Sequence, residues 1–207
     1  MRLRVGEESV VLHPDRALVW RETVVVADVH LGKGDSFRAR GLPLPAGELE
    51  DDLVRLGALL AATGARRLVV IGDLVHGTLA PATVARVTQW REATRAEWLL
   101  VRGNHDRHGV PADWGVDIVD EVLVDGPFAF VHEPAAVAGS FTWSGHLHPT
   151  VAIRGTADRL RFPAFLVGAS LGVLPAFTRF SGGPVIRGEA GWRRFACAPG
   201  EVLALDD

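Results

Sequence analysis

The sequence contains one cysteine, one lysine and no tyrosine among its 207 residues. A lone cysteine, Cys197, cannot form an internal disulfide, and this is typical of proteins from reducing compartments. No run approaches the roughly 20 consecutive apolar residues that span a membrane, and no stretch after Met1 resembles a signal peptide. We therefore expect a cytoplasmic protein that does not enter a membrane.

An excess of basic residues is also missing, because the net charge is −3. The chain as a whole lacks the positive footprint of an avid nucleic-acid binder, although a local basic patch stays compatible with this charge. Hydrophobic residues make up 48% and charged residues 23% of the chain, a balance that excludes extended disorder. At this length we predict a single domain over residues 1–207.

The first half of the chain alternates strand patterns with helix patterns. Strands are predicted at 9–13, 17–20, 22–27, 67–73 and 98–106, helices at 46–63 and 81–95, and a loop at 32–47. In the first helix a leucine recurs every three or four residues from Leu49 to Leu60, and Gly64 follows as a cap. This alternation predicts parallel strands joined by crossover helices.

The second half has a different pattern of predicted strands and helices. From about Asp117 short strand patterns follow one another without a helix-length amphipathic stretch. Strands in such close succession are mostly antiparallel. The two halves together predict an α/β fold in which two sheets pack face to face with helices outside.

Polar side chains end five of the apolar strand patterns. Six of the eight histidines lie at these ends, together with three aspartates and an asparagine: Asp28 and His30, Asp73 and His76, Asn104 to Asp106, His132, and His146 and His148. Because the carboxyl ends of parallel strands share one edge of a sheet, segments far apart in the sequence meet there. We therefore expect these residues to form one site.

The ligand types at this edge indicate a metal centre. Carboxylates, imidazoles and an amide without thiolate suit Mn, Fe, Zn or Co better than calcium. The candidates are too numerous for one ion, and two ions held about 3.5–4 Å apart would need an anionic bridge. Asp73, in the middle of the set, is the candidate bridge.

These motifs resemble those of the calcineurin-like metallophosphoesterases. The shared pattern is D-x-H at Asp28, G-D at Gly72, G-N-H-D at Gly103, a lone His132, and G-H-x-H at Gly145. The resemblance implies a four-layer α/β/β/α sandwich of two mixed sheets and two divalent ions, with Mn²⁺ favoured and Fe, Zn, Co or Mg as alternatives. It assigns one metal to Asp28, His30, Asp73 and His148, and the other to Asp73, Asn104, His132 and His146.

Over most of its length the chain is also similar to the ligase-associated DNA damage response endonucleases. The supporting stretches include DVHLGKGDSFRARGLPLP, VRGNHDRHG and LPAFTRFSGG. This likeness implies DNA as the substrate and DNA ligase and helicase repair proteins as partners. One departure is His76, which stands where the common G-D-x-x-D block has its second carboxylate. A similar GDLxH occurs in double-strand-break repair nucleases of the fold.

The implied reaction is in-line attack of a metal-bridging hydroxide on a phosphodiester. His105 would be the catalytic imidazole acting on the leaving oxygen, and Asp106 would orient it. Lys33, Arg38, Arg107 and His76 are the candidate contacts to substrate phosphates.

Two other functions fit the sequence. The first keeps the chemistry but acts on a small nucleotide or another organic phosphodiester, and the net charge slightly favours it. The second is a protein-binding scaffold of the same fold without catalysis. Because His105 and every ligand position are filled, the scaffold is the weaker alternative.

Overall fold

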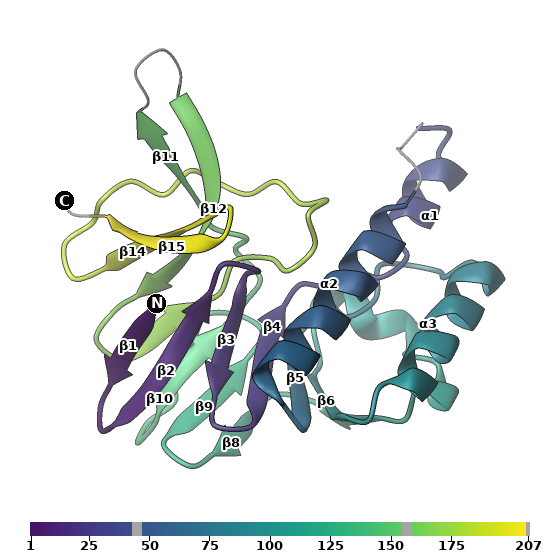
Figure 1. The fold of residues 1–207 in the computed structure, drawn as a ribbon, viewed down its shortest axis with the longest axis horizontal. Helices are drawn as coiled ribbons and strands as arrows, with labels where there is room; N and C mark the ends of the chain where they lie inside the picture. The colour runs from purple at the N-terminus through teal and green to yellow at the C-terminus, as the bar shows by residue number, and fades with distance from the viewer. Residues whose placement is uncertain (43–46, 155–158, 206–207) are drawn as a thin grey trace.

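In the computed structural model, which describes residues 1–42, 47–154 and 159–205, two mixed β-sheets pack against each other (Figure 1). The first sheet has the order β1-β2-β3-β4-β5-β6-β7. Its strands are Arg2–Val5 (β1), Glu8–His13 (β2), Ala17–Trp20 (β3), Thr23–Ala27 (β4), Arg67–Ile71 (β5), Glu97–Val101 (β6) and Val116–Val119 (β7). Strands β1 to β4 pair antiparallel, and β4 to β7 pair parallel.

Three α-helices connect these strands. They are Lys33–Ala39 (α1), Glu48–Thr63 (α2) and Pro81–Ala93 (α3), and two short 3-10 helices follow at Asn104–His108 (η1) and Ala112–Trp114 (η2). In α2 the leucine stripe is buried, and Gly64 ends the helix with the left-handed conformation (φ 64°) that glycine adopts without strain. None of the helices in the described ranges is both long and apolar enough to cross a membrane.

The prediction of a loop over 32–47 is wrong in part, because Lys33–Ala39 form helix α1. This helix has only seven residues and no apolar stripe, so the sequence carried no periodic signal for it. A tertiary contact holds it, because Asp35 accepts hydrogen bonds from the backbone of Ala80 and the hydroxyl of Thr83. Residues 43–46, which include the predicted start of the next helix, lie outside the described residues.

The second sheet has the order β15-β14-β12-β13-β10-β9-β8, and β11 pairs with β12. Its strands are Leu123–Asp125 (β8), Phe128–Val131 (β9), Phe141–Ser144 (β10), Thr150–Arg154 (β11), Arg159–Val167 (β12), Leu171–Val173 (β13), Arg193–Ala198 (β14) and Glu201–Leu205 (β15). All pairs are antiparallel except those that β10 makes with β9 and β13. The predicted, mostly antiparallel second half is confirmed.

Two apolar layers hold these parts together. One lies between the sheets and includes Trp20, Phe128 and Trp143, while the other lies between the first sheet and the helices. The α/β fold with two mixed sheets is therefore as predicted. All α-helices in the described part of the chain precede β6. Their apolar residues pack with those of the first sheet, so they cover that sheet rather than the outer face of the second.

Strand register brings the polar strand ends to one edge. Ala27 pairs with Ile71 and Ile71 with Val101, so the residues that follow β4, β5 and β6 leave the sheet at the same level. In the second sheet Val131 pairs with Ser144, so the residues after β9 and β10 do the same. The polar residues that follow these strands in both sheets therefore lie close together.

Candidate metal centre

The backbone at the candidate centre is unusual. Five of the predicted ligands adopt left-handed conformations, at φ values of 55° for Asp28, 52° for His30, 51° for Asp73, 69° for His146 and 47° for His148. Among the other non-glycine residues that the structure describes, only Arg16 and Arg21 share this conformation. Each such residue costs about 1 kcal/mol or more, and such strain gathers at functional sites.

Backbone amides orient the two buried aspartates. The Asp28 carboxylate accepts a hydrogen bond from the amide of His146 on Oδ2 (2.9 Å), and the Asp73 carboxylate accepts one from the amide of His105 on Oδ1 (2.8 Å). Each bond therefore ties a strand end to a segment that carries another candidate ligand.

The motifs need glycine at two positions because no room is left there for a side chain. A Cβ atom added to Gly145 would lie 2.7 Å from the Cβ of Ala27 and 2.8 Å from Asp28 Oδ2. A Cβ atom at Gly103 would collide with the backbone nitrogen of Asp73. The G-N-H-D and G-H-x-H motifs therefore need glycine because the segments press directly on the two aspartates.

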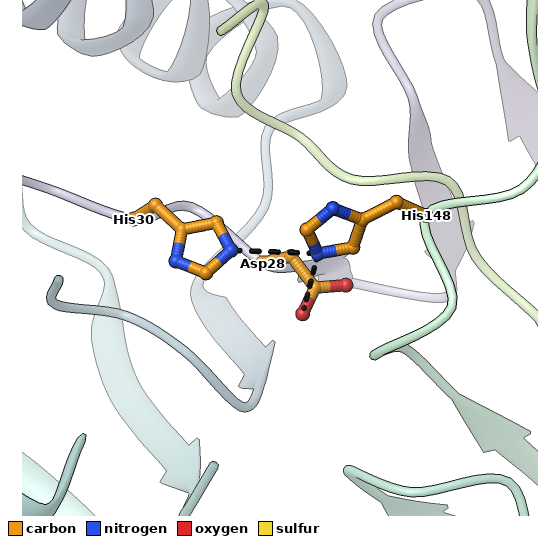
Figure 2. A group of neighbouring side chains, drawn as sticks. All are labelled: Asp28, His30 and His148. Atoms are coloured by element: carbon orange, nitrogen blue, oxygen red, sulfur yellow. Dashed lines mark hydrogen bonds and ion pairs between the residues drawn. The ribbon is translucent and has the colours of Figure 1, made fainter. Parts of the chain in front are cut away.

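Asp28, His30 and His148 form the first ligand group. Figure 2 shows their side chains turned toward one another, with His148 Nε2 lying 3.4 Å from Asp28 Oδ1 and 3.4 Å from His30 Nε2. One ligand atom from each lies within 4.8 Å of the others.

Asp28, Asp73 and His132 form a second group by the same criterion. His132 Nε2 lies 3.6 Å from Asp73 Oδ1, 2.9 Å from the amide oxygen of Asn104, and 3.1 Å from His146 Nδ1. The structure thus gathers all seven predicted ligands. Asp28 is common to both groups. Asp73 belongs to the second group and also lies near the first, because its Oδ2 is 3.9 Å from His30 Nε2. Both carboxylates are therefore close to imidazoles of both groups.

The donor set fits divalent cations. Asp28 is fully buried, and its Oδ1 has no hydrogen-bond partner among the described residues. A buried carboxylate oxygen without a donor is costly unless a cation compensates it. Burial, assisted by the nearby Lys33 ammonium, lowers the pKa of His30 to about 2. The imidazole is therefore neutral at physiological pH, and this is the form that binds a metal.

His105 lies at the rim of the centre. Its ring stacks on that of His76 with centroids 4.5 Å apart, and His76 Nδ1 lies 3.2 Å from His30 Nδ1. Burial lowers the pKa of His76 to about 4, so this ring is neutral as well. His76 therefore contacts both a candidate ligand and the candidate catalytic imidazole, whose own ring centroids lie 5.3 Å apart.

Asp106 makes its hydrogen bonds to backbone amides rather than to the ring of His105. Its two oxygens accept hydrogen bonds from the amides of Gly103 (2.8 Å) and Val75 (3.0 Å), and burial raises its pKa. No hydrogen bond joins it to the His105 ring in the part of the chain that is described. The carboxylate is turned toward backbone amides, one of them in the residue before its own 3-10 helix. The orientation of the His105 imidazole by Asp106 stays a prediction.

The predicted cationic contacts differ in their surroundings. Lys33 is half-buried at the start of α1, and burial lowers its pKa against the attraction of Asp28 and Asp73. Arg38 is held by Glu48 (2.9 Å) and Asp35 (3.3 Å), so its guanidinium is engaged within the helical layer. Arg107 is exposed and lines a cavity that also includes Asn104 and His132.

The prediction missed the segment that follows β13. The amides of Phe177 and Thr178 donate to the carbonyls of Ala27 (2.7 Å) and Asp28 (3.4 Å), and Gly183 lies against the backbone of His148. The stretch LPAFTRFSGG contains these residues. It carries no metal-ligand type, and the paired glycines were its one signal of close backbone approach.

Comparisons with known proteins agree with this geometry. A family model described as Calcineurin-like phosphoesterase matches residues 22–161. The crystal structure of Pseudomonas putida nuclease MPE matches with a TM-score of 0.85 and 33% identity, over 99% of each chain. YfcE, a phosphoesterase from E. coli, matches with a TM-score of 0.45 and 18% identity, over 88% of this chain and 96% of that one. No curated protein sequence matches the chain.

The family model spans more than half of the chain, and the nuclease structure covers nearly all of it. The family that the five motifs predicted is confirmed by both findings. The chain belongs to the calcineurin-like phosphoesterase family.

Proposed function

We propose that this phosphoesterase hydrolyses phosphodiester bonds of nucleic acid, as a DNA-repair endonuclease with a dinuclear metal centre. The observation that carries the proposal is the convergence of seven ligand-type side chains, with two groups of them sharing the buried carboxylate of Asp28, whose Oδ1 has no hydrogen bond among the described residues. The likeness to a nuclease that is 33% identical over 99% of this chain supports nucleic acid as the substrate.

The residues would hold two ions in the way the family resemblance implies. Asp28, His30 and His148 would hold one ion, Asn104, His132 and His146 the other, with Asp73 bridging them. Bound divalent ions supply Lewis acidity, which lowers the pKa of a water to near 7 and neutralises phosphoryl oxygens. Mn²⁺ is the favoured ion, since carboxylate, amide and imidazole ligands suit it.

The chain's own residues would do the rest. His105, supported by the His76 ring, would give a proton to the leaving oxygen, a contribution typically of about 10²–10⁴ in rate. Lys33 would lie toward a phosphoryl oxygen from the start of α1, and Arg107 would contact a flanking phosphate. His76 would contact the substrate from the rim. Arg38 would do so only after leaving Glu48 and Asp35.

The alternative is a small nucleotide or other organic phosphodiester as substrate, which the net charge of −3 favours. A scaffold without catalysis is disfavoured because His105 and all ligand types are in place. The single domain over 1–207, the cytoplasmic location and the ligase and helicase partners stay predictions from the sequence.

The test is the variant His105→Ala. We expect unchanged Mn²⁺ content and at least a tenfold loss in hydrolysis of bis(p-nitrophenyl) phosphate and of single-stranded DNA, because the leaving oxygen loses its proton donor. Gln89→Ala, on an exposed position of α3, is the control. Unchanged turnover in His105→Ala would remove His105 from its role. Turnover of cyclic nucleotides with none of DNA would favour the alternative.

A further inference from the structure

The β11–β12 hairpin projects from the second sheet, away from the helical layer (Figure 1). Strand β11 begins at Thr150, two residues after the candidate ligand His148. The hairpin therefore extends directly from the edge of the metal centre.

One face of this hairpin is cationic. Arg154 pairs with Arg159, and Ala152 pairs with Arg161, and cross-strand partners point to the same side of a sheet. All three arginines are exposed. The opposite face carries Val151 and Ile153, which pack in an apolar cluster with Ala164 and Ala196. The apolar face has a structural role, whereas on the cationic face only Arg161, among the described arginines, makes hydrogen bonds within the fold.

The cationic face continues into a cavity of about 540 Å³. Four arginines line it, contributed by the β2–β3 turn, α2, β12 and the segment after β13: Arg16, Arg55, Arg161 and Arg179. Among the described lining residues, Asp15 is the one carboxylate. We name these four residues together with Arg154 and Arg159 the arginine track.

The arginine track gathers like charges, although Arg55, its most buried member, is paired with Asp52 and donates a hydrogen bond to the carbonyl of Phe177. Arg154 and Arg159 are like charges directly opposite each other, an arrangement that destabilises a sheet. Burial lowers the pKa of Arg55 to about 10, and Arg16 and Arg179 add repulsion. Asp52 pairs with Arg55 at 3.0 Å, yet Arg55 is only 8% exposed and its Nε has no hydrogen-bond partner among the described residues.

Some donors of the track are used within the fold. Arg16 donates to the carbonyl of Thr178 (2.6 Å), and Arg161 donates to that of Gly183 (2.6 Å). Within the described ranges, the guanidinium groups of Arg154, Arg159 and Arg179 have no hydrogen bond or ion pair. Asp158, next to Arg159 in the sequence, lies outside those ranges.

The track reaches the candidate centre through the segment after β13. Arg161 holds Gly183, which lies against the backbone of His148. Arg16 holds Thr178, whose amide donates to the carbonyl of Asp28 (3.4 Å). A chain of phosphates leaving the centre along this segment would meet the arginines in turn.

We propose that the arginine track binds the phosphates of a nucleic-acid strand beyond the scissile bond. This inference rests on the proposed function. The track is a local basic surface, which is compatible with the net charge of −3 of the whole chain. Arginine is suited to this role, since its planar guanidinium binds phosphate through two parallel hydrogen bonds.

The test measures binding of a fluorescent 20-nucleotide oligo-dT to metal-free protein, by anisotropy, over a salt series. Arg154→Gln combined with Arg159→Gln removes two exposed track residues that have no described partner. Each lost phosphate contact lowers the slope of log K against log salt by about 0.7 for a single strand, so we expect a loss of about 1.4 in slope and about tenfold in affinity near 0.1 M salt. Arg2→Gln with Arg4→Gln, two exposed arginines of β1, is the matched control.

A second readout separates this inference from the proposed function. The ratio of kcat/KM for oligo-dT to that for bis(p-nitrophenyl) phosphate should fall about tenfold in the track variant and stay at the wild-type value in the control. No oligo-dT binding by the wild type, or equal losses in track and control variants, would overturn the proposal. Track-dependent binding without Mn²⁺-supported hydrolysis of either substrate would instead overturn the proposed function and leave the track in place.

Discussion

Asp28 combines two features at the scale of a single residue, a buried oxygen atom without a donor and a left-handed backbone (φ 55°). Both lower the stability of a protein without metal, and both place the carboxylate where imidazoles from two sheets meet. Both features are costs that a bound cation would offset.

The variant Asp28→Asn separates these roles. Asn tolerates the left-handed conformation and still accepts the hydrogen bond from His146, while the buried charge is gone. We expect loss of bound Mn²⁺ and a metal-free protein stabilised by roughly 1 kcal/mol, or about 2–4 °C in Tm. Metal analysis and calorimetric melting in a chelator check this.

Asp73→Asn should also lose metal, because Asp73 is the predicted bridge. Asp117→Asn, on an exposed position of β7, is the control and should match the wild type in both measurements. Two full equivalents of Mn²⁺ in Asp28→Asn would contradict the assigned ligand role.

At the scale of elements, the segment after β13 decides where His148 lies. Gly183 touches the carbonyl group of His148 so closely that a Cβ atom would collide with its oxygen. Gly182, the neighbouring residue, has no atom within 4 Å of an added Cβ. The two glycines offer a matched pair for testing this contact.

We expect Gly183→Ala to displace His148 or the segment, because overpacking of this kind costs about 1–3 kcal/mol. Calorimetric titration with Mn²⁺ should show at least a tenfold weaker affinity and a lower Tm. Gly182→Ala should stay within about 0.5 kcal/mol of the wild type. Equal effects of the two substitutions would show that the contact with His148 does not matter.

The elements also show what the sequence could and could not predict. Strands β4, β5 and β6 and helix α2 were predictable, since each has a long apolar pattern and a clear cap or turn. Helix α1 and strand β7 were not, because α1 depends on Asp35 binding a distant helix, and β7 has no fully buried residue. That the candidate ligands lie close together was predictable, because residue type and strand position both mark them. The hydrogen bonds of Asp106 and the segment after β13 depend on backbone contacts, which residue types do not reveal.

At the scale of the molecule, the candidate centre joins the two sheets. Asp28 and Asp73 follow strands of the first sheet, whereas His132 and His146 follow strands of the second. Bound ions would therefore hold the sheets together at one edge, and removing them should weaken the whole fold rather than one loop.

We expect Mn²⁺ added to chelated protein to raise Tm by about 5–10 °C at a hundredfold excess over Kd, since binding at that excess contributes about 2.7 kcal/mol. Calorimetry with a Mn²⁺ series gives the measurement, and Ca²⁺ is a control because the imidazole-rich set suits it poorly. A Tm independent of Mn²⁺ would contradict a centre that spans both sheets.

The single lysine at the start of α1 has a practical consequence for anyone who labels this protein. Amine-reactive dyes and surface linkers can acylate only the N-terminal amine, which donates to the carbonyl of Leu12, and Lys33 beside the two aspartates. Thiol chemistry offers no substitute, since Cys197 is buried and burial raises its pKa to about 12. Tethering for single-molecule work therefore calls for a newly introduced handle, because acylating Lys33 would place the tag beside the candidate metal centre.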